Sequence, residues 1–289
     1  MNIFRYVGGK SHLIDVLLKL VPPGGRPYCE PYAGAANLFW RRAPAPIEVL
    51  NDTDKNIYTL YFVLRNSELR EKFIEMVHLT PYSREFFKEA IGVLETTDDP
   101  VERAWAFYYL ANSSFGGKVN NVTPGNWGRS MVRNQPITWF NKINNLDKII
   151  KRLSNAYIDC IDGIKCIEYW DNESAVFYVD PPYHPDSVSW KNFSRYYSNY
   201  PDHDYHVKLA NTLLQCKGAV VLSGYDNPAY KILEDNGWIK LKYDSIAYLA
   251  GTTKDNKQYG RISEREKREE CIWLNHKIEH YKMALFNKQ

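Results

Sequence analysis

The sequence predicts an α/β protein in which an open, mostly parallel sheet is interrupted by a mainly helical insertion. Three observations support this fold class. Short apolar segments at 27–31 and 47–50 flank a turn rich in small residues, a β-α-β pattern typical of nucleotide-binding sheets. The hydrophobic period is helical from 55 to 112, and short apolar segments resume after residue 155.

This pattern divides the chain into a sheet domain (residues 1–55 and 156–289) and an inserted subdomain (residues 56–155). In the first part, Ser11 can cap a helix over 11–20, and the turn after the first strand is expected to open a helix that continues through Trp40. Within the insertion, helices are expected between 55 and 112, including 101–110, and over 141–153.

In the second part the sequence predicts five further strands, at 157–160, 175–179, 219–222, 238–243 and 271–274, the last two as edge strands. Helices are expected at 163–170, 202–216 and 227–236. The charge-rich stretch 251–270 predicts a loop or an exposed helix.

Composition excludes several classes of protein. The 289 residues are 44% hydrophobic and 25% charged, and no apolar run approaches the roughly 18 residues of a spanning helix, which excludes disordered, fibrous and membrane proteins. The N-terminus lacks the layout of a secretory signal. The five cysteines form no Cys-x-x-Cys pair, so we expect neither disulfides nor a zinc site, and a reducing, cytoplasmic environment.

Positive charge is concentrated in one part of the insertion. Residues 116–155 contain seven basic residues and one acidic residue, a net charge of +6, whereas the whole chain has +3. Such a block suits a polyanion such as nucleic acid, and Lys118, Arg129 and Arg133 are the candidate contacts. The alternative is a solvated basic face balanced by acids elsewhere.

The strongest chemical signal is Asp180-Pro181-Pro182-Tyr183, directly after a buried strand. Ligands of open α/β sheets bind at the carboxyl ends of strands, and two prolines make a stiff turn there. The turn would present a carboxylate, the carbonyl of Pro181 and an aromatic ring, which suits a planar ligand with an exocyclic amino group. The alternative is a strand-ending turn in which Asp180 is only a cap.

A second signal lies at the end of the first strand, where the segment from Glu30 to Ala36 lets a ligand approach the backbone closely. It lacks the phosphate-binding lysine of a P-loop, so a nucleoside fits better than a pyrophosphate. Asp52 ends the next strand, eighteen residues after Gly34, close to the offset at which an acidic residue meets ribose hydroxyls. Asp54 competes for this role, and either can cap the following helix.

Taken in order, the motifs FRYVGGK (4–10), EPYAGAANLF (30–39), NDTDKN (51–56) and DPPY (180–183) resemble those of the Dam-type (alpha-group) N6-adenine-specific DNA methyltransferases. The segments 222–228 and 267–275 are similar to late motifs of that family. The resemblance covers about 1–60 and 155–275, and implies a Rossmann-like S-adenosylmethionine-dependent methyltransferase sheet with an inserted target-recognition subdomain.

The resemblance also implies residue roles. Asp180, Pro181, Pro182 and Tyr183 would be catalytic, with Asp180 facing both cofactor and target base. The residues implied to bind the cofactor are Tyr6, Lys10, Glu30, Tyr32, Ala33, Gly34, Asp52, Ile161, Asp162 and Asp180. The family usually has Phe at position 32 and Gly-x-Gly from position 34, where this chain has Tyr and Gly-Ala-Ala.

The implied activity is transfer of a methyl group from S-adenosylmethionine to the N6 amino group of an adenine flipped out of double-stranded DNA, in the cytoplasm of a bacterium or of a phage's host. The loop 184–200, with its tyrosines, would line the base pocket. No metal is expected, and His203 and His206 are expected on a helix. Alternatives are methylation of cytosine N4 or of RNA, or a catalytically silent DNA-binding module. The recognised sequence, the oligomeric state and any restriction partner stay open.

Overall fold

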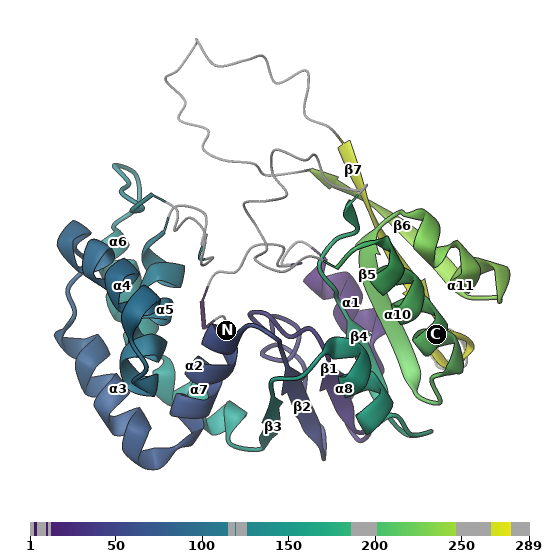
Figure 1. The fold of residues 1–289 in the computed structure, drawn as a ribbon, viewed down its shortest axis with the longest axis horizontal. Coiled ribbons are helices and arrows are strands. Elements are labelled where there is room, and N and C mark those ends of the chain that lie inside the picture. Colours follow the sequence, from purple (N-terminus) through teal and green to yellow (C-terminus); the bar gives the residue numbers. More distant parts are fainter. Residues whose placement is uncertain are drawn as a thin grey trace, which may run out of the picture.

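The strands form one mixed sheet in the order β3-β2-β1-β4-β5-β7-β6 in the computed structural model (Figure 1). The structure describes residues 3–4, 10, 13–114, 119, 126–185, 201–246 and 267–278. The strands are β1 (Tyr28–Glu30), β2 (Glu48–Asn51), β3 (Ala156–Asp159), β4 (Val176–Val179), β5 (Ala219–Tyr225), β6 (Ile239–Ile246) and β7 (Lys267–Leu274). The predicted α/β class is confirmed.

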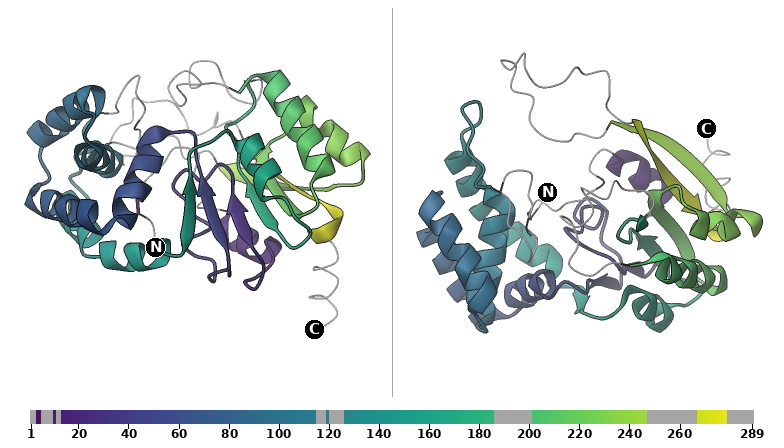
Figure 2. Two further views of the ribbon diagram at one scale, coloured as in Figure 1. Left: turned by 60° about the horizontal axis from the view of Figure 1, so that its bottom comes forward. Right: turned by 45° about the horizontal axis from the view of Figure 1, so that its top comes forward.

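The helices flank the sheet and fill the insertion. They are α1 (Ile14–Leu20), α2 (Lys55–Arg65), α3 (Ser67–Leu79), α4 (Arg84–Thr96), α5 (Pro100–Ser113), α6 (Gln135–Ile143), α7 (Leu146–Leu153), α8 (Gly163–Trp170), α10 (His203–Gln215), the short 3-10 helix η3 (Pro228–Tyr230) and α11 (Lys231–Asp235). Figure 2 shows α3, α4 and α5 gathered beside the sheet, at the end opposite α11. None of the helices in the described ranges is long and apolar enough to cross a membrane.

The core lies on both faces of the central strands, which explains why β4 is apolar at every position. Val176 and Tyr178 pack with α1 and the insertion helices, whereas Phe177 and Val179 pack with α8 and α10. All four side chains are buried. The sequence of a strand that is covered by helices on both faces is apolar at successive positions.

The helix starts follow from capping residues. Asp54 accepts a hydrogen bond from the Asn56 amide and caps α2, so the competitor of Asp52 is a capping residue. Asp99 caps α5 in the same way, with Pro100 in the first turn. Leu13 is the N-cap residue of α1 without a side-chain bond, and the predicted cap Ser11 lies outside the described residues.

Three expectations about local structure are wrong. The segment after β1 makes turns rather than a helix through Trp40, because Gly34 and Ala36 have φ angles of +48° and +50°, in the left-handed region. β7 is not an edge strand, because it lies antiparallel between β5 and β6. Residues 267–270, expected in a loop or an exposed helix, belong to this strand.

Candidate active site

Five parallel strands bring the predicted site residues to one edge of the sheet. β3, β2, β1, β4 and β5 are neighbours in parallel pairs, so their carboxyl ends point the same way. Glu30 is the last residue of β1, Asp52 follows β2 and Asp180 follows β4. The sheet topology therefore places these three carboxyl groups at its ligand-binding edge.

Asp180 is held by side chains from two other parts of the chain. The Ser223 hydroxyl on β5 donates a hydrogen bond to Asp180 Oδ1 at 2.9 Å, since the pairing of Val179 with Leu222 puts Ser223 beside it. Lys10 Nζ lies 3.2 Å from the same oxygen. Burial raises the pKa of the Asp180 carboxyl above its ordinary value, against the opposing effects of Lys10 and Ser223. Its side chain is 20% exposed, so a ligand can reach it.

Lys10 is the centre of a buried charged group. Its ammonium donates to the Tyr183 hydroxyl at 2.8 Å and lies 3.2 Å from Glu270 Oε2 on β7. Burial alone would lower the pKa of Lys10, but Asp180, Tyr183 and Glu270 raise it well above its ordinary value. The ammonium therefore stays charged and links Asp180, Tyr183 and Glu270.

Tyr183 stacks on Tyr225 from the end of β5. The ring centroids are 4.4 Å apart and the planes differ by 23°. The Tyr183 hydroxyl also lies 3.4 Å from Glu270 Oε1, as a weak donor. Tyr225 thus covers one face of the ring that is predicted to stack on the target base.

Glu30 supports the loop after β1. Its Oε1 accepts hydrogen bonds from the Tyr28 hydroxyl and the Phe39 amide, both at 2.8 Å. Burial raises the pKa of Glu30 to about 8. The side chain is 2% exposed, so these contacts hold the backbone beside the predicted cofactor site.

Asp52 binds the small-residue turn. One carboxylate oxygen accepts from the Gly34 amide at 2.8 Å, and the other accepts from the Asp54 amide at 2.9 Å. Burial raises the pKa of Asp52 to about 6. Asn51 ties the neighbouring loops together, because its amide donates to the carbonyls of Pro31 and Ile161.

Asp162 and Tyr32 are joined through α10. Asp162 caps α8, and it also accepts a 3.0 Å hydrogen bond from Tyr205, whose hydroxyl lies 2.8 Å from that of Tyr32. The Tyr32 ring lies against Gly163, where a Cβ atom would come within 2.2 Å of Tyr32 Cζ. Ile161 is 38% exposed, so it offers an apolar contact surface at this edge.

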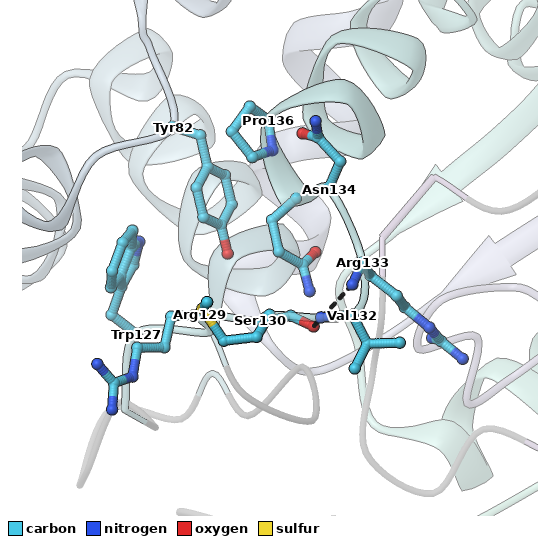
Figure 3. A pocket seen from close by; sticks show the side chains of 10 residues that line it. Tyr82, Trp127, Arg129, Ser130, Val132, Arg133, Asn134 and Pro136 are labelled. Carbon is cyan, nitrogen blue, oxygen red and sulfur yellow. Dashed lines mark hydrogen bonds between the residues drawn. The ribbon is translucent and has the colours of Figure 1, made fainter. Parts of the chain in front are cut away.

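Two of the predicted DNA-binding residues, Arg129 and Arg133, lie among the described residues of the insertion. Arg129 and Arg133 are exposed in a loop of residues 128–134, which we call the basic loop. The Ser130 hydroxyl accepts from the Arg133 amide at 3.0 Å (Figure 3). The loop lines a cavity of about 530 Å³ together with Tyr82 and Trp127 (Figure 3).

The structure divides the basic block of 116–155. Arg152 is not available to a ligand, because it forms a buried ion pair with Glu48 and donates to its Oε1 at 2.6 Å. Lys142 donates to Asn112. Part of the charge of this block therefore stabilises the fold, whereas Arg129 and Arg133 are exposed.

Some expectations fall outside the described residues. They concern Tyr6, Lys118 and the segment 186–200 that contains most of the predicted base-pocket loop. His203 and His206 lie on α10 as expected. Within the described ranges, no group of three His, Cys, Asp or Glu side chains is arranged to hold a metal ion.

Sequence reasoning did not assign Ser223, Tyr225 and Glu270 to the site. Ser223 and Tyr225 were within a noted late motif, and the pairing of β4 with β5 is the signal that would have placed Ser223 beside Asp180. Glu270 lies in the other such segment, 267–275, within a charged stretch, and the apolar residues that follow it mark a strand.

Comparison with known proteins agrees with this geometry. Residues 6–245 match the model of the D12 class N6 adenine-specific DNA methyltransferases. A DNA adenine methylase of Salmonella typhi is 24% identical over 77% of this chain and 80% of its own length. A type II methyltransferase of Lactococcus lactis subsp. cremoris is 27% identical over 78% of this chain and 81% of its own length.

A type II methyltransferase of Methanocaldococcus jannaschii is 25% identical over 68% of this chain and 75% of its own length. The matched family model covers most of the chain and specifies adenine N6 in DNA, which favours that target over cytosine N4 and RNA. The chain belongs to the D12 class N6 adenine-specific DNA methyltransferase family.

Proposed function

We propose that the corner formed by Asp180, Pro181 and Tyr183 binds the amino group of an adenine that has been flipped out of duplex DNA, and directs it at the methyl group of S-adenosylmethionine. The observation that carries this proposal is the Asp180 carboxylate, which is reachable from solvent and fixed by Ser223 and Lys10 at the end of β4. Unstacking the base costs a few kcal/mol, which contacts with the duplex must offset.

The donor set of the strand ends fits this cofactor. When bound, S-adenosylmethionine supplies an electrophilic methyl group on a positively charged sulfur. The carboxyl groups of Asp52, Asp162 and Asp180 follow three of four neighbouring parallel strands, and Glu30 ends the fourth. Acidic groups suit both a cation and ribose hydroxyls. We assign the ribose to Asp52 and the adenine edge of the cofactor to Ile161 and Asp162.

The remaining assignments concern the loops beside the strand ends. Tyr32, Ala33 and Gly34 would contact the cofactor through the turn after β1, and Tyr6 through the N-terminal motif. Lys10 keeps its proposed contact with the cofactor, while its ammonium is bound to Asp180, Tyr183 and Glu270 in the structure. Its primary effect is therefore on the catalytic corner.

The chain's residues prepare a weak nucleophile. The N6 lone pair of adenine is delocalised into the ring. Hydrogen bonds from N6 to Asp180 and to the Pro181 carbonyl localise that pair and stabilise the positive charge that develops on nitrogen. A nitrogen–carbon bond forms while the carbon–sulfur bond breaks, with its electron pair left on sulfur. Asp180 then accepts the excess proton, which a carboxyl group with a raised pKa does more readily.

Tyr183 positions the base. Its hydroxyl is held by Lys10, so the ring has a fixed orientation when the base stacks on it. Pro182 restricts the backbone between the two catalytic side chains. Because Tyr225 covers one face of the ring, the base uses the other face or displaces Tyr225.

The basic loop is the proposed DNA contact, through Arg129 and Arg133, with Lys118 from the same insertion. Both arginines are exposed and flank Met131 and Val132, which are themselves fully exposed. Arginine is suited to phosphate oxygens and to base edges. We place the reaction in the cytoplasm of a bacterium or of a phage's host, where this substrate is found.

The test is methylation of duplex DNA with isotopically labelled S-adenosylmethionine, followed by mass spectrometry of the nucleosides. We expect N6-methyladenine with the natural protein. Asp180→Ala should reduce the rate by at least about a hundredfold, because it removes the principal acceptor, while the fold is kept. Asp226→Asn is the matched control, since Asp226 is exposed and pairs with Lys240. Near-normal activity of Asp180→Ala would overturn the mechanism.

A further inference from the structure

Glu270 is a buried carboxylate that the mechanism above does not use. It lies on β7, opposite Tyr225 on β5 and opposite Tyr243 on β6. Its side chain is 3% exposed, although it lies in a charged segment. The antiparallel position of β7 between these two strands brings Glu270 to the end of the sheet where β4 and β5 meet the catalytic corner.

The contacts of Glu270 are the same groups that hold the corner. Oε2 is 3.2 Å from Lys10 Nζ, and Oε1 is 3.4 Å from the Tyr183 hydroxyl. Lys10 Nζ in turn is 3.2 Å from Asp180 and 2.8 Å from the Tyr183 hydroxyl. One ammonium is therefore shared between two carboxyl groups and a phenol, and Glu270 is the member that does not belong to the catalytic turn.

We propose that Glu270 is a positioning residue for methyl transfer. It acts through Lys10, because the Lys10 ammonium contacts both Glu270 and Asp180. This inference rests on the proposed function, since it concerns the same corner. With Glu270 in place, Lys10 is centred where it can hold the Tyr183 hydroxyl, and Asp180 keeps lone pairs for the adenine amino group. Without it, Lys10 pairs with Asp180 alone, competes with the amino group and releases Tyr183.

The charges around Asp180 predict a measurable effect of Glu270 on the pKa of Asp180. Lys10 lowers the pKa of Asp180 and Glu270 raises it, although burial has the largest effect. Loss of the Glu270 charge should therefore lower the pKa of Asp180. The charged, titratable or hydrogen-bonding groups that face Asp180 from the surrounding elements are Lys10, Glu30, Tyr178, Tyr183, Ser223, Tyr230 and Glu270.

The chain offers a matched control on the same strand. Glu269 is the preceding residue of β7, is 46% exposed and pairs with Lys242 at 2.7 Å. Side chains alternate between the faces of a strand, so Glu269 is directed away from the corner. Glu270→Gln and Glu269→Gln each remove one negative charge with little change in shape, and they differ in the contact with Lys10.

The experiment combines an equilibrium and a kinetic measurement. Carbon NMR of the Asp180 carboxyl, in protein labelled at aspartate and without cofactor, follows its titration in both variants. Single-turnover methylation is measured across pH at saturating cofactor and DNA. We expect Glu270→Gln to lower the Asp180 pKa by about half a unit or more and to slow the single-turnover rate about tenfold. The acidic limb of the rate profile should move to lower pH, and Glu269→Gln should match the natural protein.

An unchanged Asp180 pKa in folded Glu270→Gln would overturn the proposal, whether or not the rate falls, because Glu270 would then be merely structural. Should Glu270→Gln fail to fold, Glu270→Asp keeps the charge and loses reach. We expect the Asp180 pKa of Glu270→Asp to stay close to that of the natural protein, while the single-turnover rate falls. A pKa and a rate that both match the natural protein would overturn the proposal. Absence of adenine methylation by the natural protein would instead overturn the proposed function, which the cofactor-free titration does not depend on.

Discussion

Individual side chains determine how this methyltransferase responds to pH, and His206 is the clearest case. It is buried on α10, and Nδ1 lies 2.7 Å from the Tyr230 hydroxyl. Burial, together with the neighbouring His184 and His203, lowers the pKa of His206 to about 4. The imidazole is therefore neutral in the folded protein, at pH values where it is protonated in the unfolded chain.

This difference predicts a loss of stability in acid. Below the unfolded pKa of about 6.5, only the unfolded chain binds a proton at His206, so stability falls as the pH drops from there to about 4. The natural protein should lose free energy of unfolding between pH 7 and pH 5, and we expect His206→Gln to reduce this loss by up to about 2 kcal/mol. Urea unfolding at the two pH values measures it. His78→Gln, at an exposed position of α3, should leave the curve unchanged. Parallel curves for the natural protein and His206→Gln would contradict this assignment.

At the scale of elements, the proposal gives the basic loop and the strand ends separate roles. Ser130 shapes the loop by accepting hydrogen bonds from the amides of Val132 and Arg133. The strand ends hold the carboxyl groups that we propose to act in cofactor binding and methyl transfer. A change in the loop should therefore alter DNA affinity and leave the chemistry of the bound complex nearly unchanged.

We expect Arg129→Ala and Arg133→Ala each to weaken DNA binding and to reduce the slope of log affinity against log salt by about 1, the loss of one phosphate contact. Fluorescence anisotropy with labelled duplex DNA over a range of salt measures this. Lys231→Ala on α11 is the control, because Lys231 is exposed and pairs with Asp235 at the other end of the molecule (Figure 1). An unchanged slope for both arginine variants would reassign the loop to a solvated surface.

At the scale of the whole molecule, the helical insertion and the sheet share one hydrophobic core. The same cluster contains Phe107 of α5, Leu60 of α2 and Val176 of β4. Phe4, from the N-terminal segment, packs edge-on against Phe107, with the ring centroids 5.2 Å apart. Residues of the predicted sheet domain and of the predicted insertion at 56–155 thus belong to the same cluster of buried residues.

This shared core predicts one cooperative unfolding transition. Phe107→Ala should lower the free energy of unfolding by about 3–5 kcal/mol, because it leaves a cavity between the insertion and the N-terminal segment. In calorimetry the transition should shift to lower temperature and remain single. Phe62→Ala, at a residue that is 40% exposed on α2, is the control and should cost about 1 kcal/mol or less. Two separate transitions would show that the insertion folds as an independent unit.

Local sequence determined most of the elements and the catalytic motif of this protein. The strand before Asp180, the small-residue turn after Glu30 and the helices between residues 55 and 112 follow from spacing, capping and hydrophobic period, which act between residues close in the chain. The expected helix over 141–153 is instead divided into α6 and α7. The register of parallel strands then brings Glu30, Asp52 and Asp180 to one edge.

Only the tertiary structure decided how these groups are charged and held. Lys10 and Glu270 lie near opposite ends of the chain, and they meet because β7 is inserted between β5 and β6. In the same way, Arg152 is bound to Glu48 instead of facing solvent. The physical reason is that ion pairs in a folded interior depend on which strands become neighbours and on how much water is excluded, neither of which is encoded in the spacing of nearby residues.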